Sequence, residues 1–385
     1  MSVSVPPSSA VFASPLSALV RGGQSSAPAF TSPQSAAPSV RLDLNESTFQ
    51  LTPEMRQRIG EVSAQVSLTG YPDGACVALR KAACRYFGVR DLDGMAVGNG
   101  AEDLIGRLCA AFGQPRPGCR QASILVPELS FEAYRMAAEA SGMAIEAFCF
   151  EPNGHPEMSR LDAAVEAVRP NLVFLATPNN PTGQAIEPEQ MKSFMQRHPD
   201  VLFVLDEAYI GYSSTASLAD DVLDFPNAVC LSSLSKFGLA GLRLGFATAH
   251  PSVIRVLDGV RMPFPINALS QAVGTMLLEE FSEAIDDAMQ RTAEERERVF
   301  HSLVELQAAS NGAFRVLPSE GNFHVVFCDH AEALHAGLAS RGVMVRRFQA
   351  PHDHHPLSQT LRISVGTPKD NNAMLRAMKA ALAAQ

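Results

Sequence analysis

From residue 71 onward, short apolar runs alternate with helix-like segments, and this rhythm restricts the possible folds more than any other feature of the sequence. The runs are continuously apolar, which is typical of strands that are covered on both faces. Helix-like segments separate most of them, for example at residues 103–112, 131–141 and 188–197. The pattern predicts an α/β fold with a doubly wound, mostly parallel sheet of about seven strands. The expected strands are residues 95–97, 123–126, 144–150, 172–175, 201–205, 228–231 and 242–247.

The pattern changes after residue 267. A long helical stretch over residues 268–306 is followed by short apolar segments and a last helix over residues 372–384. Strands with helices on one side are typical of a smaller α+β domain. We therefore expect a large domain of residues 71–267 and a small domain that is assembled from residues 41–70 and 268–385.

Residues 1–40 differ from the rest of the chain. Ser, Ala and Pro dominate this segment, and Arg21 is its single charged side chain. Low charge and scattered prolines favour neither a packed core nor a long helix. We expect a flexible arm, which either remains an unstructured tail or docks on a partner subunit.

Composition excludes several classes of protein. The chain carries 31 Lys and Arg against 40 Asp and Glu, and the net charge of -9 argues against a protein that binds duplex nucleic acid. Its seven cysteines contain no C-x-x-C pair, which indicates thiols in a reducing compartment. No apolar run is long enough to span a membrane. We expect a cytoplasmic protein.

Polar clusters follow four of the expected strands, at residues 98–103, 177–183, 206–209 and 233–236. In open α/β sheets, ligands bind at the edge formed by the carboxyl ends of the strands. Each cluster is a weak signal alone: the first, for example, has Asp103 where a dinucleotide fingerprint needs its third glycine. Together, however, the four clusters suit a single ligand.

That ligand is a phosphorylated aromatic aldehyde. Lys236 follows an apolar run and can form an imine with an aldehyde. Asp206 can hold a proton on a pyridine nitrogen. Gly100 and Ala101 open a helix whose amides can bind phosphate, and a group of polar side chains near the lysine can complete that phosphate cup. These side chains are Ser233, Ser235 and Arg243.

Five motifs recur in an order that resembles the fold-type I pyridoxal-phosphate aminotransferases, and in particular the histidinol-phosphate aminotransferase branch. The resemblance extends over residues 41–368, which is nearly everything after the arm. It implies a large domain with a mostly parallel seven-stranded sheet and a smaller α+β domain. The motifs are Tyr71-Pro72-Asp73, Gly98-Asn99-Gly100, residues 178–183, residues 206–209, and Ser235-Lys236 with residues 238–243.

The resemblance also implies catalytic roles. Lys236 is the lysine that forms the Schiff base with pyridoxal phosphate and then moves a proton as acid and base. Asp206 pairs with the pyridinium nitrogen. Tyr209 and Asn180 hydrogen-bond the phenolic oxygen of the cofactor, and Phe131 stacks on its ring. For Phe131, plain core packing is the alternative.

The remaining implied roles concern binding. Phosphate contacts come from the helix start and from the side chains near the lysine. For Ser233, the alternative is that its hydroxyl hydrogen-bonds only backbone groups. The phosphate-binding set is Gly100, Ala101, Glu102, Ser233, Ser235 and Arg243. Arg362 binds the anionic end of the substrate, with Asn45 and Asn180 beside it. Tyr71 either reaches the cofactor of a neighbouring subunit, which requires a homodimer, or caps a turn.

The substrate is the least determined feature. Histidinol phosphate with 2-oxoglutarate is the leading expectation, while Gly70 and Ser47-Thr48-Phe49 depart from that branch near its substrate pocket. A decarboxylase or lyase resembling threonine-phosphate decarboxylase, and an aminotransferase of a specialised pathway, remain alternatives. A cofactor-binding gene regulator is disfavoured because residues 1–40 are too short and uncharged to form a DNA-binding module. The segment from His352 to His355 is expected to be a solvated loop instead of a metal site.

Overall fold

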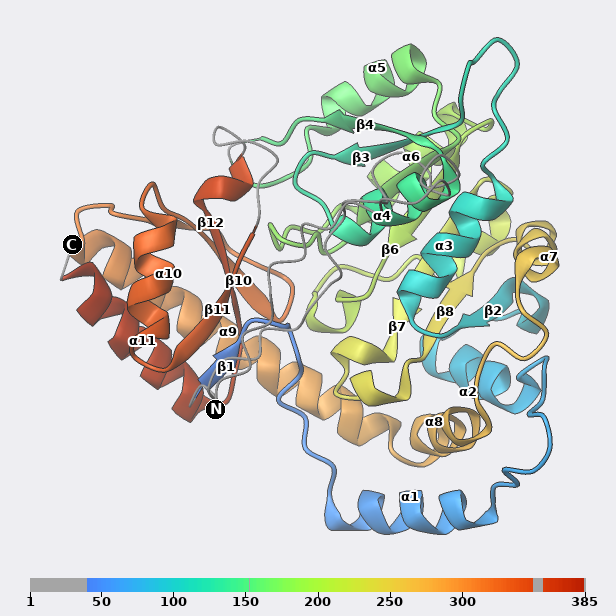
Figure 1. The fold of residues 1–385 in the computed structure, drawn as a ribbon, viewed down its shortest axis with the longest axis horizontal. Coiled ribbons are helices and arrows are strands. Elements are labelled where there is room, and N and C mark those ends of the chain that lie inside the picture. The colour runs from blue at the N-terminus through green and yellow to red at the C-terminus, as the bar shows by residue number, and fades with distance from the viewer. Residues whose placement is uncertain (1–39, 152, 349–355, 384–385) are drawn as a thin grey trace, which may run out of the picture.

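The computed structural model describes residues 40–151, 153–348 and 356–383. Nearly all of the expected arm and the segment from His352 to His355 lie outside the described residues. Two β-sheets, each with its own helices, make up the described part of the chain (Figure 1). Within this part, no helix has the length and apolar character that crossing a membrane requires.

The first sheet has seven strands in the order β2-β8-β7-β6-β5-β3-β4. β8 alone runs opposite to the other six strands of this sheet, which confirms the predicted mostly parallel sheet. The strands are β2 (Met95–Gly98), β3 (Ser123–Pro127), β4 (Ala144–Phe148), β5 (Leu172–Ala176), β6 (Leu202–Asp206), β7 (Ala228–Ser233) and β8 (Gly245–Thr248). The expected start of the last strand at residue 242 was wrong, because Ala240–Leu242 form a 3-10 turn and Arg243 has a φ of 53°.

Helices cover both faces of this sheet, as a doubly wound fold requires. One face packs against α3 (Ala101–Ala111), α4 (Glu132–Ser141) and α7 (Pro251–Val260). The opposite face packs against α2 (Val77–Phe87), α5 (Met158–Val168), α6 (Pro188–Arg197) and α8 (Ala268–Glu280). Successive strand residues such as Ile124 and Leu125 enter opposite cores, which explains why the strands are apolar throughout.

The second sheet has five strands in the order β1-β11-β12-β10-β9. They are β1 (Val40–Leu42), β9 (Arg315–Val316), β10 (Phe323–Phe327), β11 (Val343–Arg347) and β12 (Thr360–Ser364). One face shares a core with α10 (Ala331–Ala339), α11 (Pro368–Leu382) and the later turns of α9 (Ser282–Ala309). Leu361 and Ile363 enter that core, so Arg362 and Ser364 point to the opposite face.

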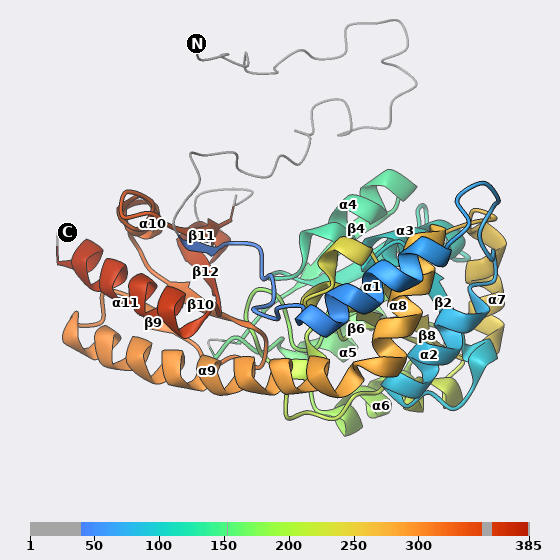
Figure 2. The same ribbon diagram turned by 90° about the horizontal axis from the view of Figure 1, so that it is seen from below.

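The long helical stretch after residue 267 is two helices, because the chain breaks at Phe281 between α8 and α9. Figure 2 shows α9 running along both parts of the molecule. Ile285 near its start belongs to the core of the first sheet, whereas Leu303 belongs to the core of the second. Meanwhile α1 (Pro53–Gln65) packs on α8. We propose that the division between the two parts falls within α9.

Candidate active site

The carboxyl ends of the central strands bring the sequence motifs together. Asp206 is the last residue of β6, and Ser233 is the last residue of β7. Strand pairing then places Ser233 beside Gly245, and Gly245 beside Gly98 at the end of β2. Lys236 lies in the short turn Leu234–Lys236 that follows β7. Ala176, the last residue of β5, pairs with Asp206 and directly precedes residues 177–183. The four polar clusters therefore meet at one edge of the sheet, as predicted.

Lys236 reaches from this edge toward the second sheet. Its Nζ lies 3.4 Å from the carbonyl oxygen of Leu44, to which it donates. The same nitrogen lies 5.7 Å from the ring centre of Tyr209. The hydroxyl of Tyr212 donates to the backbone carbonyl of Lys236 and fixes this turn. The amine thus lies between the two parts of the molecule, beside a phenol ring.

Asp206 is a buried carboxylate with two hydrogen-bond donors. The hydroxyl of Tyr134 donates to Oδ2 over 2.6 Å, and the backbone N–H of Ala208 donates to Oδ1 over 3.1 Å. Burial raises the pKa of Asp206, while these two hydrogen bonds and the charge of Lys236 act in the opposite direction. The carboxylate is therefore held in place without a full ion pair.

The predicted phosphate-binding residues also lie together. The Nη1 of Arg243 donates to Ser235 Oγ over 3.3 Å, and its Nη2 contacts Glu102 at 3.0 Å. The backbone N–H of Ser235 donates to Ser233 Oγ over 3.1 Å, which agrees with the alternative of a backbone cap for Ser233. This cluster lies at the start of α3, where unpaired backbone N–H groups favour an anion.

Two glycines allow this close approach. Gly100 precedes α3 with a φ of 87°, and a Cβ at this position would collide with the guanidinium of Arg243. A Cβ at Gly245 would lie 2.6 Å from the backbone nitrogen of Ala101. A cationic side chain, hydroxyl groups and a helix start, brought close together by two glycines, fit a phosphate group. Lys236 and Asp206 likewise fit an aldehyde carbon and a pyridine nitrogen.

Arg362 extends the site toward the second sheet. Its guanidinium is buried and donates to Asn180 Oδ1 over 2.7 Å and to the carbonyl oxygen of Asp43 over 3.0 Å. Its buried Nε has no hydrogen-bond partner within the described ranges. Burial lowers the pKa of Arg362 to about 10. A buried cation with an unused donor is suited to bind an anion.

Asn45 and Tyr209 complete this part of the site. The Nδ2 of Asn45 donates to the hydroxyl of Tyr209 over 3.1 Å. Ser364 Oγ fixes the amide of Asn45, since it donates to Oδ1 over 2.9 Å. The structure thus brings together the expected substrate and cofactor residues from both sheets.

Arg346 is a candidate that the sequence analysis missed. It pairs directly with Arg362 across β11 and β12, so both side chains lie on the same face. The two guanidinium carbons lie 5.9 and 5.7 Å from the ring centre of Phe348. The charge of Arg346 also contributes to the lowered pKa of Arg362. The available signal was the sequence Arg346-Arg347, directly after the short apolar segment at residues 343–345.

Phe131 and Tyr71 occupy different environments. Phe131 precedes α4 and packs edge-on against Tyr134, with ring centres 5.6 Å apart. Tyr71 is 84% exposed and stacks on Phe264 at 4.4 Å. The structure places Phe131 next to a partner of Asp206, and it places Tyr71 on the surface.

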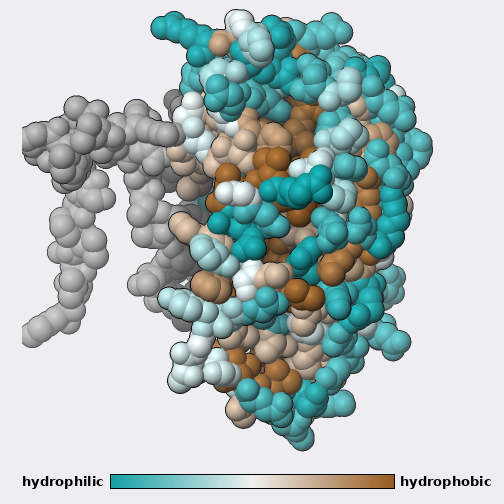
Figure 3. Space-filling view, turned by 90° about the vertical axis from the view of Figure 1, so that its right-hand side faces the viewer, coloured by the Kyte–Doolittle hydropathy of each residue, from teal (hydrophilic) through white to brown (hydrophobic). Residues whose placement is uncertain are grey.

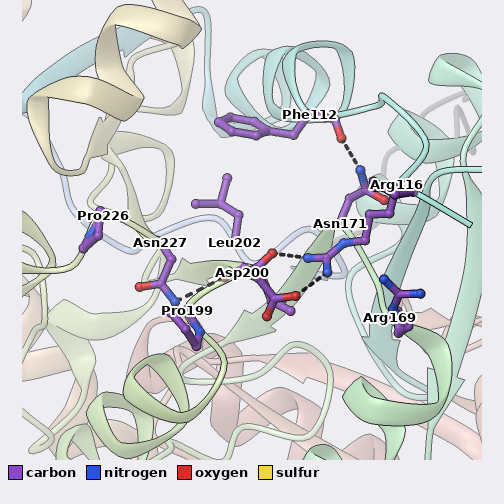
Figure 4. A pocket seen from close by; sticks show the side chains of 11 residues that line it. Phe112, Arg116, Arg169, Asn171, Pro199, Asp200, Leu202, Pro226 and Asn227 are labelled. Carbon is purple, nitrogen blue, oxygen red and sulfur yellow. Dashed lines mark hydrogen bonds and ion pairs between the residues drawn. The ribbon is translucent and has the colours of Figure 1, made fainter. Parts of the chain in front are cut away.

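A separate cavity of about 490 Å³ lies at the opposite edge of the first sheet (Figure 4). Its polar groups are largely paired with one another: Arg116 contacts Asp200 at 2.6 Å, and Asn171 Nδ2 donates to the carbonyl oxygen of Phe112 over 2.8 Å. None of the predicted site residues lines it. The candidate active site is therefore the cluster at the carboxyl edge.

Comparison with known proteins gives a match to a family model over most of the chain. Residues 37–378 match the family described as "Aminotransferase class I and II". This chain belongs to that family. The aminotransferase is 34% identical over 352 residues to "Histidinol-phosphate aminotransferase 2" from Bordetella bronchiseptica, with 91% of this chain and 92% of the relative covered.

Two further comparisons extend the picture. The aminotransferase is 32% identical over 376 residues to "Aromatic amino acid aminotransferase" from Corynebacterium jeikeium, with 95% of each chain covered. Its fold matches the crystal structure of histidinol-phosphate aminotransferase from Sinorhizobium meliloti in complex with pyridoxal-5'-phosphate, with a TM-score of 0.79 at 23% identity. That match covers 90% of this chain and 92% of the other. The chain is thus a fold-type I aminotransferase that uses pyridoxal phosphate.

Proposed function

We propose that this aminotransferase transfers an amino group between histidinol phosphate and 2-oxoglutarate. The observation that carries the proposal is the arginine pair, Arg346 and Arg362, on one face of the second sheet. Two adjacent guanidinium groups repel each other, and a doubly charged anion between them relieves that repulsion. A phosphate monoester is such an anion, and the relatives named histidinol-phosphate aminotransferase support this choice.

We propose the following catalytic roles for the residues at the sheet edge. Bound pyridoxal phosphate supplies an electron sink for the electrons that are released when a bond to the substrate Cα breaks. Lys236 Nζ would hold the cofactor aldehyde and, once the substrate amine has displaced it, the free amine would take the proton from the substrate Cα. Asp206 holds the proton on the pyridine nitrogen. Tyr209 and Asn180 donate to the phenolic oxygen, and Phe131 lies against the ring.

The phosphate of the cofactor is assigned to the cluster at the start of α3. We propose that the N–H groups of Ala101 and Glu102 bind it together with Arg243 and Ser235. Ser233 also belongs to this proposed set, although its hydroxyl already accepts a backbone N–H. Glu102 contacts Arg243 at 3.0 Å through Nη2, and we propose that this contact gives way when phosphate binds.

We propose that the enzyme works as a homodimer. Apolar groups gather on the molecular face that Figure 3 shows. Tyr71 is exposed and stacked on Phe264, while Met262 is 76% and Leu68 is 74% exposed. Such a surface is typical of a contact between subunits. In the proposed dimer, Tyr71 reaches the cofactor phosphate of the neighbouring subunit.

A cytoplasmic location is also a proposal. All seven cysteines lie in the described part of the chain, and each is a free thiol. Free thiols are typical of proteins in a reducing compartment.

A substrate comparison tests the proposed reaction. We expect 2-oxoglutarate to be converted to glutamate with histidinol phosphate as donor. The kcat/KM should be roughly a hundredfold or more above that for unphosphorylated histidinol, because a phosphate between two arginines gains several charge-assisted hydrogen bonds. A preference for phenylalanine would contradict the substrate. Carbon dioxide release from threonine phosphate, without conversion of the cofactor to its amine form, would favour a decarboxylase instead.

A further inference from the structure

Tyr134 has a contact with the cofactor-binding carboxylate that its place in the sequence does not reveal. It lies in the first turn of α4, in the helix layer that covers one face of the first sheet. Its hydroxyl donates to Asp206 Oδ2 over 2.6 Å. The backbone N–H of Ala208 binds Oδ1, so the contact of Tyr134 with Oδ2 fixes the rotation of the carboxylate group.

The ring of Tyr134 is fixed on two sides. It stacks on Phe174 of β5 with ring centres 4.8 Å apart and an angle of 14°. Phe131 meets it edge-on at 88°, and the backbone N–H of Tyr134 donates to the carbonyl oxygen of Phe131 over 3.2 Å. The side chain is fully buried, so its hydroxyl has little freedom to turn away from Asp206.

We propose that Tyr134 is a positioning residue, which aims the Asp206 carboxylate at the pyridine nitrogen of the cofactor and fixes the ring of Phe131 beside the same site. A neutral donor suits this role because it orients the carboxylate without cancelling its charge. A cationic donor would weaken the attraction between Asp206 and a protonated pyridine.

The charged and titratable groups around the Tyr134–Asp206 hydrogen bond influence the pKa values of both residues. Lys236 lowers the pKa of Asp206, whereas Glu102 and burial raise it. The adjacent Glu207 is also fully buried, and its carboxylate accepts from the backbone N–H of Leu218 over 2.8 Å. Cys230 also interacts electrostatically with Asp206, and Tyr209 interacts in the same way with Tyr134. Burial and Asp206 raise the pKa of Tyr134 well above its usual value, so its phenol stays a donor.

The Tyr134→Phe variant removes the hydroxyl and keeps the stacked ring. Cofactor affinity, measured by equilibrium dialysis of pyridoxal phosphate across a pH series, is a readout that does not require turnover. A hydrogen bond to a charged group favours its ionised form. Loss of the Tyr134 hydrogen bond should therefore raise the pKa of Asp206. Cofactor affinity should then begin to fall at a pH that is about one to two units higher than in the native enzyme. An unchanged pH profile would overturn the proposal.

The Tyr86→Phe variant is a matched control, because the hydroxyl of Tyr86 donates to Asp286 Oδ1 over 2.7 Å and Tyr86 packs on the opposite face of the first sheet from Tyr134. It should leave the pH profile of cofactor affinity unchanged. If Tyr86→Phe shifted the pH profile of cofactor affinity as much as Tyr134→Phe does, the result would contradict a specific role of Tyr134.

A double-mutant cycle separates positioning from packing. In an Asp206→Asn background, Tyr134→Phe should have little further effect on cofactor affinity. An additional loss as large as in the native background would overturn the proposal. If Tyr134→Phe folds only in the Asp206→Asn background, the hydroxyl acts through the buried charge, as proposed. Failure to fold in both backgrounds would mean that the hydroxyl of Tyr134 is needed for the fold independently of the Asp206 charge, and this would overturn the proposal.

Discussion

The Arg346→Met variant tests the recognition of a phosphorylated substrate. Arg346 lies beside Arg362 on one face of the second sheet, and their guanidinium carbons lie 5.9 and 5.7 Å from the ring centre of Phe348. Methionine keeps much of the side-chain volume and removes the charge. The variant should therefore weaken the binding of a doubly charged group and leave the rest of the site intact.

The size of the expected loss in kcat/KM depends on how exposed the Arg346 side chain is. Hydrogen bonds to charged groups contribute about 1.5–3 kcal/mol, but Arg346 is only partly buried and solvent screens part of this contribution. About 1–2 kcal/mol remains, which corresponds to a loss of roughly 5- to 30-fold in kcat/KM for histidinol phosphate. Unphosphorylated histidinol lacks the group that Arg346 binds, so its kcat/KM should change by less than about twofold.

Steady-state kinetics with the two donors measures this difference. Arg347→Met is the matched control, because Arg347 contacts Glu332 at 3.3 Å and alternation along β11 places it on the opposite face. The control should affect neither donor. An equal loss for both donors in Arg346→Met, or an equal loss in Arg347→Met, would refute recognition of the phosphate by this arginine pair.

Three further changes test other parts of the site. Asp206→Ala should keep some cofactor but reduce kcat by about a hundredfold or more, since each unit of change in the pyridine pKa represents about 1.4 kcal/mol; an unchanged kcat would exclude its role. Arg362→Ala should mainly raise KM for anionic substrates. In the unchanged enzyme, KM for these substrates should rise as pH increases through about 10, where Arg362 loses its charge. A KM that changes neither with the substitution nor with pH would assign the anion to another residue. Gly245→Ala should weaken cofactor binding, because its Cβ would lie 2.6 Å from the nitrogen of Ala101. Gly259→Ala is its control in open space, and equal cofactor affinities in the two variants would contradict the close-approach argument.

The pattern along the chain was sufficient to predict the first sheet and to propose most of the candidate site. Continuous apolar runs identified its strands, and the polar clusters after them included Asp206 and Lys236. These features are local in sequence, and the geometry of parallel sheets places the carboxyl ends of the strands together. The break at Phe281 was not predictable because helical sequence continues on both sides of it.

The residues that were missed depend on contacts between distant segments. Arg346 becomes a neighbour of Arg362 only through the register of β11 and β12. Tyr134 reaches Asp206 only because α4 packs over the end of β6, 72 positions away in the sequence. Neither register nor helix placement is visible in a single sequence. For Tyr71, a single chain shows an exposed ring but does not show the neighbouring subunit that the proposed role requires.

The attachment site of the cofactor tests the central claim most directly. The sequence contains five lysines, and four of them lie on helices, namely Lys81, Lys192, Lys369 and Lys379. Borohydride reduction of the enzyme with its cofactor, followed by peptide mass spectrometry, identifies the lysine that carries the phosphopyridoxyl group. The account predicts this group on Lys236 and its loss in Lys236→Ala, together with nearly all turnover. Attachment to another lysine, or retained turnover in Lys236→Ala, would contradict it.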